Sequence, residues 1–262
     1  MNENRMRYKK NQQMIVVVLI LTSLTYLASV ITDFNILHGL ATLPEAFIWI
    51  FSNLVVTEES LERMPTILDK LVETILMSIA ATTTATVVSL LLGVMGSKAV
   101  GTSKLLGILA RFIASLSRNI PVVAWALILL LSFGQNSLTG YLALFVGSVG
   151  FLTRAFIEVI DESSQSAVEA LQATGATYIQ IIMKAVIPEC LPQMISWILF
   201  MIETNIRNAT LVGILTGTGI GYTFDLYYKT LNYHGVALVT VSIVLAVIFI
   251  ELLSNHVRKV IL

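Results

Sequence analysis

Long apolar stretches without charged side chains constrain this chain more than any other feature of its sequence. The first, Met14–Ile31, contains eighteen residues and no charge. A helix that crosses the hydrocarbon core of a bilayer needs about 20 mostly apolar residues, because its backbone must pair internally. Charged residues make up 12% of the chain, whereas soluble domains carry about 25%. The sequence therefore predicts an all-α membrane protein.

Further apolar stretches of spanning length follow along the chain. We expect spans at Val72–Met95, Val122–Phe133, Leu138–Ile157, Leu191–Leu211 and Val236–Leu253, with an amphipathic helix at Ser103–Ser117 leading into Val122–Phe133. The second span is rich in Ala, Ser, Thr and Gly, which favours close packing between helices. A shorter apolar segment, Leu43–Val56, is expected to form a helix that lies along the outer interface or packs against the bundle. The predicted total is about six transmembrane helices.

The basic residues gather on one side of this threading. Twelve of the sixteen Lys and Arg residues fall inside: Arg5, Arg7, Lys9, Lys10, Lys98, Lys104, Arg111, Arg118, Arg154, Lys184, Arg258 and Lys259. Loops that stay in the cytoplasm carry an excess of Lys and Arg. Both termini and the segment 161–188 are therefore expected to be cytoplasmic. The net charge of the chain is +0, so no bulk attraction to nucleic acid is expected.

The loop 161–188 contains Glu169–Pro188, the longest stretch of the chain that is neither membrane-like nor a plain solvent loop. Helix formers fill its first half, Gly175 interrupts them, and a second amphipathic stretch covers 177–186. Pro188 suits the first turn of a further helix, because the N–H that it lacks has no partner there. We expect a short helix, a glycine bend, a second helix and then the start of a span.

Glu169, Ala170, Gly175 and Pro188 stand at the spacing of a known motif, and the segment resembles the EAA loop of ABC-importer permeases. It departs from that motif at Leu171, where the family has a second alanine. In the family the loop is cytoplasmic, and its short coupling helix docks into a groove of the ATPase subunit. The resemblance implies the type I ABC importer permease fold (MetI-like), with these four positions coupling to an ATPase dimer. ATP and Mg then belong to that partner, and no cofactor is expected in this chain.

Two charged residues, Glu203 and Arg207, fall near the expected end of the fifth span. Charges inside a span are costly, and they mark functional sites by default. Because the two residues are four apart on a helix, they are placed to form an ion pair. Two interpretations stay open at this point: a bridge that fixes helix position near the outer interface, or a charged group on a substrate path.

A glycine-rich run follows the charged pair. Four glycines and two threonines fall within the nine residues from Gly213 to Gly221. Glycine disfavours helix by about 1 kcal/mol per residue, so we expect no stable helix here. The run fits either a helix break near the translocation path or a glycine-rich outer loop.

Three patches resemble the phosphonate-type members of the same family: Glu203–Thr210, Arg118–Pro121 with Trp125, and Glu251–Ser254 with Arg258. The resemblance implies import of phosphonate or a related phosphorus oxyanion across the bacterial cell (inner) membrane. A periplasmic or lipid-anchored solute-binding protein would deliver it. One coupling loop per chain and two ATPase sites imply a second permease copy, most simply a homodimer. For the substrate path we propose Asn205, Arg207, Asn208, Gly217 and Gly219.

Alternatives include a permease for another small solute such as an amino acid, an ion-coupled secondary transporter and a membrane enzyme. Zinc-protease chemistry requires two histidines one helical turn apart, but His38, His234 and His256 are isolated, so no catalytic or metal site is expected. Secondary transporters often show repeated halves, and no internal repeat is visible. The expected domains are an N-terminal span with an outer interfacial segment at 1–64, and a permease domain at 65–262.

Overall fold

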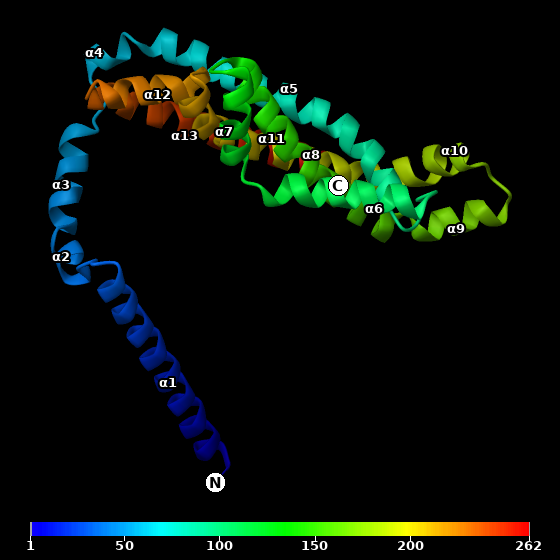
Figure 1. Cartoon of the computed structure of the whole chain (residues 1–262), viewed down its shortest axis with the longest axis horizontal. Helices are drawn as coiled ribbons and strands as arrows, with labels where there is room; N and C mark the ends of the chain where they lie inside the picture. The colour runs from blue at the N-terminus through cyan, green and yellow to red at the C-terminus, as the bar shows by residue number, and fades with distance from the viewer. Residues whose placement is uncertain (1, 262) are drawn as a thin grey trace. The chain divides into compact units, whose positions relative to one another are not determined.

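A computed structural model describes the backbone of residues 2–261 and the side chains of residues 9–261, so the side chains of Arg5 and Arg7 lie outside the description. The described residues form helices and no strand. The chain divides into an N-terminal unit (Met1–Leu54) and a bundle unit (Val55–Leu262) (Figure 1). The division falls before the boundary expected after residue 64, because the short helix α4 (Glu58–Leu61) contacts α13 (Tyr233–Ile261) of the bundle.

The N-terminal unit consists of one long and two short helices: α1 (Asn2–Ile31), α2 (Ile36–Ala41) and α3 (Leu43–Asn53). Residues 9–31 of α1 are long and apolar enough to cross a membrane, as expected for the first span. Pro44 occupies the first turn of α3, where a missing N–H is tolerated. The short apolar helix predicted at Leu43–Val56 is therefore present, although it ends at Asn53.

Four long helices form the core of the bundle unit: α5 (Met64–Gly96), α8 (Ser137–Ser163), α11 (Ile187–Thr216) and α13 (Tyr233–Ile261). Many of the small residues of α5 are buried, as predicted, although Ala80, Thr83 and Thr84 are exposed. Ser78 and Thr82 are fully buried, and each hydroxyl donates to the carbonyl four residues earlier at 2.8 Å. A Cβ on Gly96 would lie 2.5 Å from the Ile157 side chain of α8, so these two helices approach closely where side chains are small.

The third expected span is a bent pair of helices, α6 (Lys104–Asn119) and α7 (Val122–Phe133), with an angle of 94° between them. The bend falls at Pro121, which cannot continue the first helix. Trp125 Nε1 donates to the Ser117 carbonyl at 3.3 Å and joins the two helices across the bend. Among the described residues, five helices are suited to span a membrane, or six if the bent pair counts as one span. The predicted number is confirmed.

The cytoplasmic segment predicted at 161–188 lies at one end of the bundle unit, and α12 (Gly219–Lys229) lies at the opposite end (Figure 1). The segment 161–188 comprises α9 (Gln165–Ala173), α10 (Tyr178–Ile181) and a π-helical stretch (Ile182–Val186) that continues into α11. Pro188 lies in the first turn of α11, as expected. Pro192 lies inside that helix.

The glycine run contradicts the prediction that no stable helix forms there. Gly213 belongs to α11 and Gly221 belongs to α12, so the break is confined to Gly217 and Thr218. A Cβ on Gly221 would lie 2.0 Å from the Thr210 carbonyl oxygen. Close packing of α12 on α11 therefore offsets the low helix propensity of glycine. The fifth span also runs to Thr216, five residues beyond the predicted end at Leu211.

Candidate functional site

Helix α9 carries two of the predicted coupling residues on its exposed face. Glu169 and Ala170 are exposed, whereas Val168 is 2% exposed and Leu171 packs against the same apolar cluster. Apolar residues three apart lie on one side of a helix and direct it onto the bundle. The sequence of α9 thus buries one face and leaves the Glu169 face available to a partner.

The turn after α9 needs a glycine because of its backbone conformation. Gly175 has φ +78°, and apart from its chain neighbours no described residue has an atom within 4 Å of the position its Cβ would take. The Ala176 N–H donates to the Leu171 carbonyl at 3.2 Å, and the Gly175 N–H donates to the Gln172 carbonyl at 3.0 Å. This pair of bonds is a Schellman motif, which satisfies carbonyls at the end of a helix. The predicted bend at Gly175 is confirmed.

The chain resumes helix through a second local signal. Thr177 and Gln180 form a capping box at the start of α10, in which the Thr177 N–H donates to Gln180 Oε1 at 2.8 Å. Pro188 and Pro192 each remove one backbone donor from the helix that follows. The turn immediately before Pro188 widens to π geometry (Ile182–Val186), which is a common response to a locally disrupted hydrogen-bond ladder.

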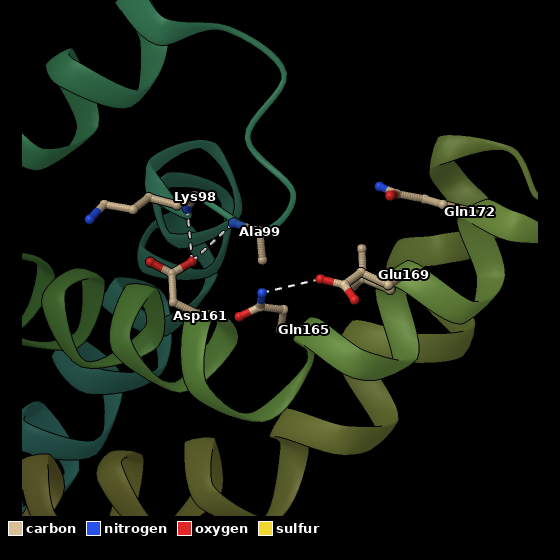
Figure 2. A pocket seen from close by; sticks show the side chains of 7 residues that line it. Lys98, Ala99, Asp161, Gln165, Glu169 and Gln172 are labelled. Atoms are coloured by element: carbon tan, nitrogen blue, oxygen red, sulfur yellow. Dashed lines mark hydrogen bonds between the residues drawn. The ribbon is translucent and has the colours of Figure 1, made fainter.

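A groove of about 500 Å³ separates α9 from the loop after α5. Its lining residues are Lys98, Ala99, Asp161, Gln165, Val168, Glu169 and Gln172. Figure 2 shows the Glu169 and Gln172 side chains reaching from α9 toward the groove, whereas the Lys98 ammonium points away from them. Pro188 is not among the residues that line it. The groove is open and mostly polar, and it adjoins the exposed face of α9.

Asp161 holds one wall of this groove in place. Its Oδ1 accepts from Ser97 Oγ at 2.6 Å, from the Lys98 N–H at 2.7 Å and from the Ala99 N–H at 3.2 Å. Hydrogen bonds to a carboxylate are about twice as strong as neutral ones. On the opposite wall, Gln165 Nε2 donates to Glu169 Oε1 at 3.1 Å (Figure 2). Sequence reasoning did not single out Asp161, although its charge at the end of the fourth span was visible.

Asn205 lies in the interior of the bundle rather than beside an open space. It is 0% exposed, and its Nδ2 donates to Thr82 Oγ1 at 2.9 Å and to Ser148 Oγ at 2.7 Å. These bonds join α11 to α5 and α8. Within the described residues its Oδ1 is buried without a hydrogen-bond partner. The residue thus ties three helices together at the centre of the unit.

Glu203 and Arg207 form the predicted ion pair, with Arg207 Nη1 lying 2.8 Å from Glu203 Oε1. They lie within α11 rather than at its end. A second arginine, Arg258 of α13, lies 3.6 Å from Glu203 Oε2. Sequence reasoning assigned Arg258 to the cytoplasmic tail. It missed this contact because nothing local relates residues 203 and 258.

The other proposed path residues lie toward the α12 end of the unit. Asn208 is half-buried on α11, Gly217 ends that helix with φ +69°, and Gly219 has φ +59°. A Cβ on Gly219 would lie 2.3 Å from Thr74 Oγ1. The same hydroxyl accepts from the Ile220 N–H at 2.9 Å. The close packing of α12 on α5 therefore requires glycine at position 219, whether or not this residue lines a substrate path.

A family model described as "Binding-protein-dependent transport system inner membrane component" matches residues 85–261. The chain belongs to this family. It is a transport permease subunit and a multi-pass protein of the bacterial inner membrane. The matched region contains α9, Gly175, the α11–α12 turn and the group formed by Glu203, Arg207 and Arg258, called here the Glu203 cluster.

Two transport proteins are similar in sequence to this chain over most of its length. The phosphite transport system permease protein PtxC of Stutzerimonas stutzeri is 31% identical over 72% of this chain and 69% of its own length. The phosphate-import permease protein PhnE of Mycolicibacterium smegmatis is 26% identical over 71% of this chain and 35% of its own length.

A solved structure supports the architecture. A chain in the inward-facing MetNI methionine ABC transporter, in its CY5 SeMet soak crystal form, matches with a TM-score of 0.70 at 21% identity. The match covers 79% of this chain and 100% of that chain. At this identity the likeness concerns the fold alone, and the expected MetI-like type I permease fold is confirmed.

Proposed function

We propose that this chain is the membrane permease of an ATP-driven importer for phosphorus oxyanions such as phosphite or phosphonates. The observation that carries the proposal is the 31% identity with a phosphite permease over 72% of the chain. The Glu203 cluster supports it, because two arginines on one carboxylate leave a net positive charge inside the bundle unit. A fixed positive charge lowers the barrier for an anion that passes close to it.

The exposed face of α9 and the adjoining groove serve as the docking site for a cytoplasmic ATPase dimer. In support, Glu169 and Ala170 are exposed while the opposite face of α9 is buried. The sequence has no phosphate-binding loop of its own, so ATP and Mg are bound by that partner. The predicted distribution of Lys and Arg puts α9 and both termini in the cytoplasm.

On the outer side, a periplasmic or lipid-anchored solute-binding protein delivers the anion to two permease copies, most simply a homodimer. Arg207 is the residue that meets the anion, since its side chain is 46% exposed. Asn208, Gly217 and Gly219 continue the proposed path. Asn205 supports the path indirectly, because its hydrogen bonds to Thr82 and Ser148 hold α11 against α5 and α8. A guanidinium at mid-helix is costly against lipid, which favours a water-filled path or a protein partner on that face.

The test is uptake into proteoliposomes that contain the permease, its ATPase and its solute-binding protein. Phosphite, phosphate, methylphosphonate and methionine are compared as solutes, and ATP hydrolysis is followed in parallel. We expect a phosphorus oxyanion to stimulate hydrolysis and to accumulate. Stimulation by methionine alone would refute the substrate class, and no stimulation by the loaded binding protein would refute the importer.

The variant Gly175→Asp tests whether the turn after α9 couples ATP hydrolysis to uptake. The substitution falls on an exposed turn with free space around it, so the bundle is expected to fold and the ATPase to bind. A side chain at positive φ strains the turn and changes how α9 is held against the bundle, while the exposed Glu169 face stays available to the ATPase. We expect ATP hydrolysis to continue while uptake is lost, and normal uptake would contradict the coupling role of this turn.

A further inference from the structure

Glu203 shares its two carboxylate oxygens between arginines of two different helices. Oε1 lies 2.8 Å from Arg207 Nη1 on its own helix, and Oε2 lies 3.6 Å from Arg258 Nη2 on α13. The second separation is an ion pair but is too long for a hydrogen bond. Arg258 Nη1 donates to Asn255 Oδ1 at 2.9 Å. Its Nη2 is buried and has no hydrogen-bond partner within the described residues.

The three side chains differ in how far they reach solvent. Glu203 is 10% exposed, Arg258 is 26% exposed and Arg207 is 46% exposed. The carboxylate is therefore less accessible to solvent than either of the two guanidinium groups, and Arg207 is the more accessible of the two. The cluster carries one negative and two positive charges, so its net charge is +1.

Apolar side chains surround the buried side of the cluster, whereas the half-exposed Arg207 side chain also faces solvent. Next to the cluster, α5, α11 and α13 enclose a crevice of about 430 Å³. Its lining includes Ile202, Ile206 and Val257, which adjoin Glu203, Arg207 and Arg258 in sequence, and also Leu253. Charges interact more strongly in such apolar surroundings than in water. Each charge of the cluster is therefore felt by any ion that approaches Arg207.

We infer that Arg258 is a positioning residue for the anion path: it holds the second oxygen of Glu203 and leaves Arg207 with uncompensated positive charge. The inference rests on the proposed function, because it assumes that the anion meets Arg207. Without Arg258, both oxygens of Glu203 are free to form a bidentate pair with Arg207. The cluster then becomes neutral, and its attraction for an anion falls.

Charge arithmetic separates this role from a simple bridge between α11 and α13. Arg258→Gln lowers the net charge from +1 to 0, and Glu203→Gln raises it to +2. The double variant Glu203→Gln/Arg258→Gln returns it to +1, with Arg207 free of a carboxylate. A bridge role predicts that the double variant is at least as impaired as Arg258→Gln. The positioning role predicts that it recovers.

The experiment measures the uptake rate and the half-saturating anion concentration in proteoliposomes with the ATPase and the solute-binding protein. We expect Arg258→Gln to weaken anion uptake about tenfold, and Arg258→Lys to retain most of it because the charge remains. The double variant is expected to return within about twofold of the wild type. A double variant no better than Arg258→Gln would overturn the positioning role.

Two further measurements keep the outcomes distinct. If Arg258→Gln does not fold, Glu203→Gln is compared with the double variant, since neither leaves an unpaired buried carboxylate. Glu203→Gln is then expected to bind the anion more tightly than the double variant does, and equal affinities would overturn the inference. If Arg207→Gln transports normally, Arg207 is off the path and the inference fails. Wild-type uptake of the oxyanion upholds the proposed function in either case.

Discussion

Two glycine-containing bends at opposite ends of the bundle unit follow the same pattern of helix, turn and helix, but they differ in how closely other parts of the chain approach them (Figure 1). At Gly175, the described part of the chain has no atom within 4 Å of the position that a Cβ would take, apart from the two adjoining residues. At the α11–α12 bend, a Cβ would lie 2.3 Å from Thr74 Oγ1 at Gly219 and 2.0 Å from the Thr210 carbonyl at Gly221. Both bends place glycine at positive φ, at Gly175 in the first and at Gly217 and Gly219 in the second, but only the second also requires glycine because of its neighbours.

The difference matches what each end has to do. The α9 end keeps an exposed helix face beside an open groove, which suits the docking of a separate subunit. At the α12 end, Ile220 is 0% exposed and packs with Ile67 and Leu238. That end closes the bundle by contacts within the chain. A glycine-rich stretch in a membrane protein is therefore not by itself evidence of a loop.

The largest expected effect is a difference in labelling between the two ends of the bundle unit, because they are predicted to face opposite sides of the membrane. Ser166 of α9 and Thr230 after α12 are both exposed, and Cys190 is buried, which limits background labelling. In intact cells, an impermeant thiol reagent is expected to label Thr230→Cys and not Ser166→Cys. Inverted vesicles are expected to give the opposite pattern. Labelling of Ser166→Cys in intact cells would reverse the orientation derived from the basic residues.

Crowding at the α11–α12 bend gives the next largest effect. Gly221→Ala places a methyl group against backbone atoms that cannot move aside, and overpacking of this kind costs about 3 kcal/mol. We expect a clearly lower melting temperature in detergent. Gly140→Ala is the matched control, because its nearest neighbours are the ends of the Thr216 and Met77 side chains at 3.3 and 3.4 Å. Equal melting temperatures for the two variants would show that the bend is not tightly packed.

The smallest effect separates backbone strain from crowding. Gly175→Ala and Gly219→Ala both place a side chain at positive φ, which costs about 1–2 kcal/mol. Only Gly219→Ala also overlaps Thr74. We expect it to destabilise the bundle, whereas Gly175→Ala frays only the α9–α10 turn. Thermal melting combined with hydrogen exchange measures both effects, and equal losses of bundle stability would remove the proposed contrast.

Local signals explain why one end was predictable from sequence. The Schellman motif at Gly175 and the capping box at Thr177 use residues within a few positions of each other. Such motifs depend little on the rest of the fold. The spans were predictable for a similar reason, because a bilayer requires continuous apolar helices. The resemblance to the EAA loop could then be placed on an element that the pattern already predicted.

Tertiary structure alone decided the other features. The α12 helix forms although glycine disfavours it, since Gly219 and Gly221 allow close contact with α5 and α11. Arg258 reaches Glu203 across fifty-five positions of sequence, and Asp161 anchors the loop after α5 from the end of α8. By itself, the sequence determined an all-helical membrane chain with a bend at Gly175, because those features depend on hydropathy and local backbone bonds. Which glycines pack helices, and which cations share a carboxylate, depends on contacts between distant segments that only the folded bundle brings together.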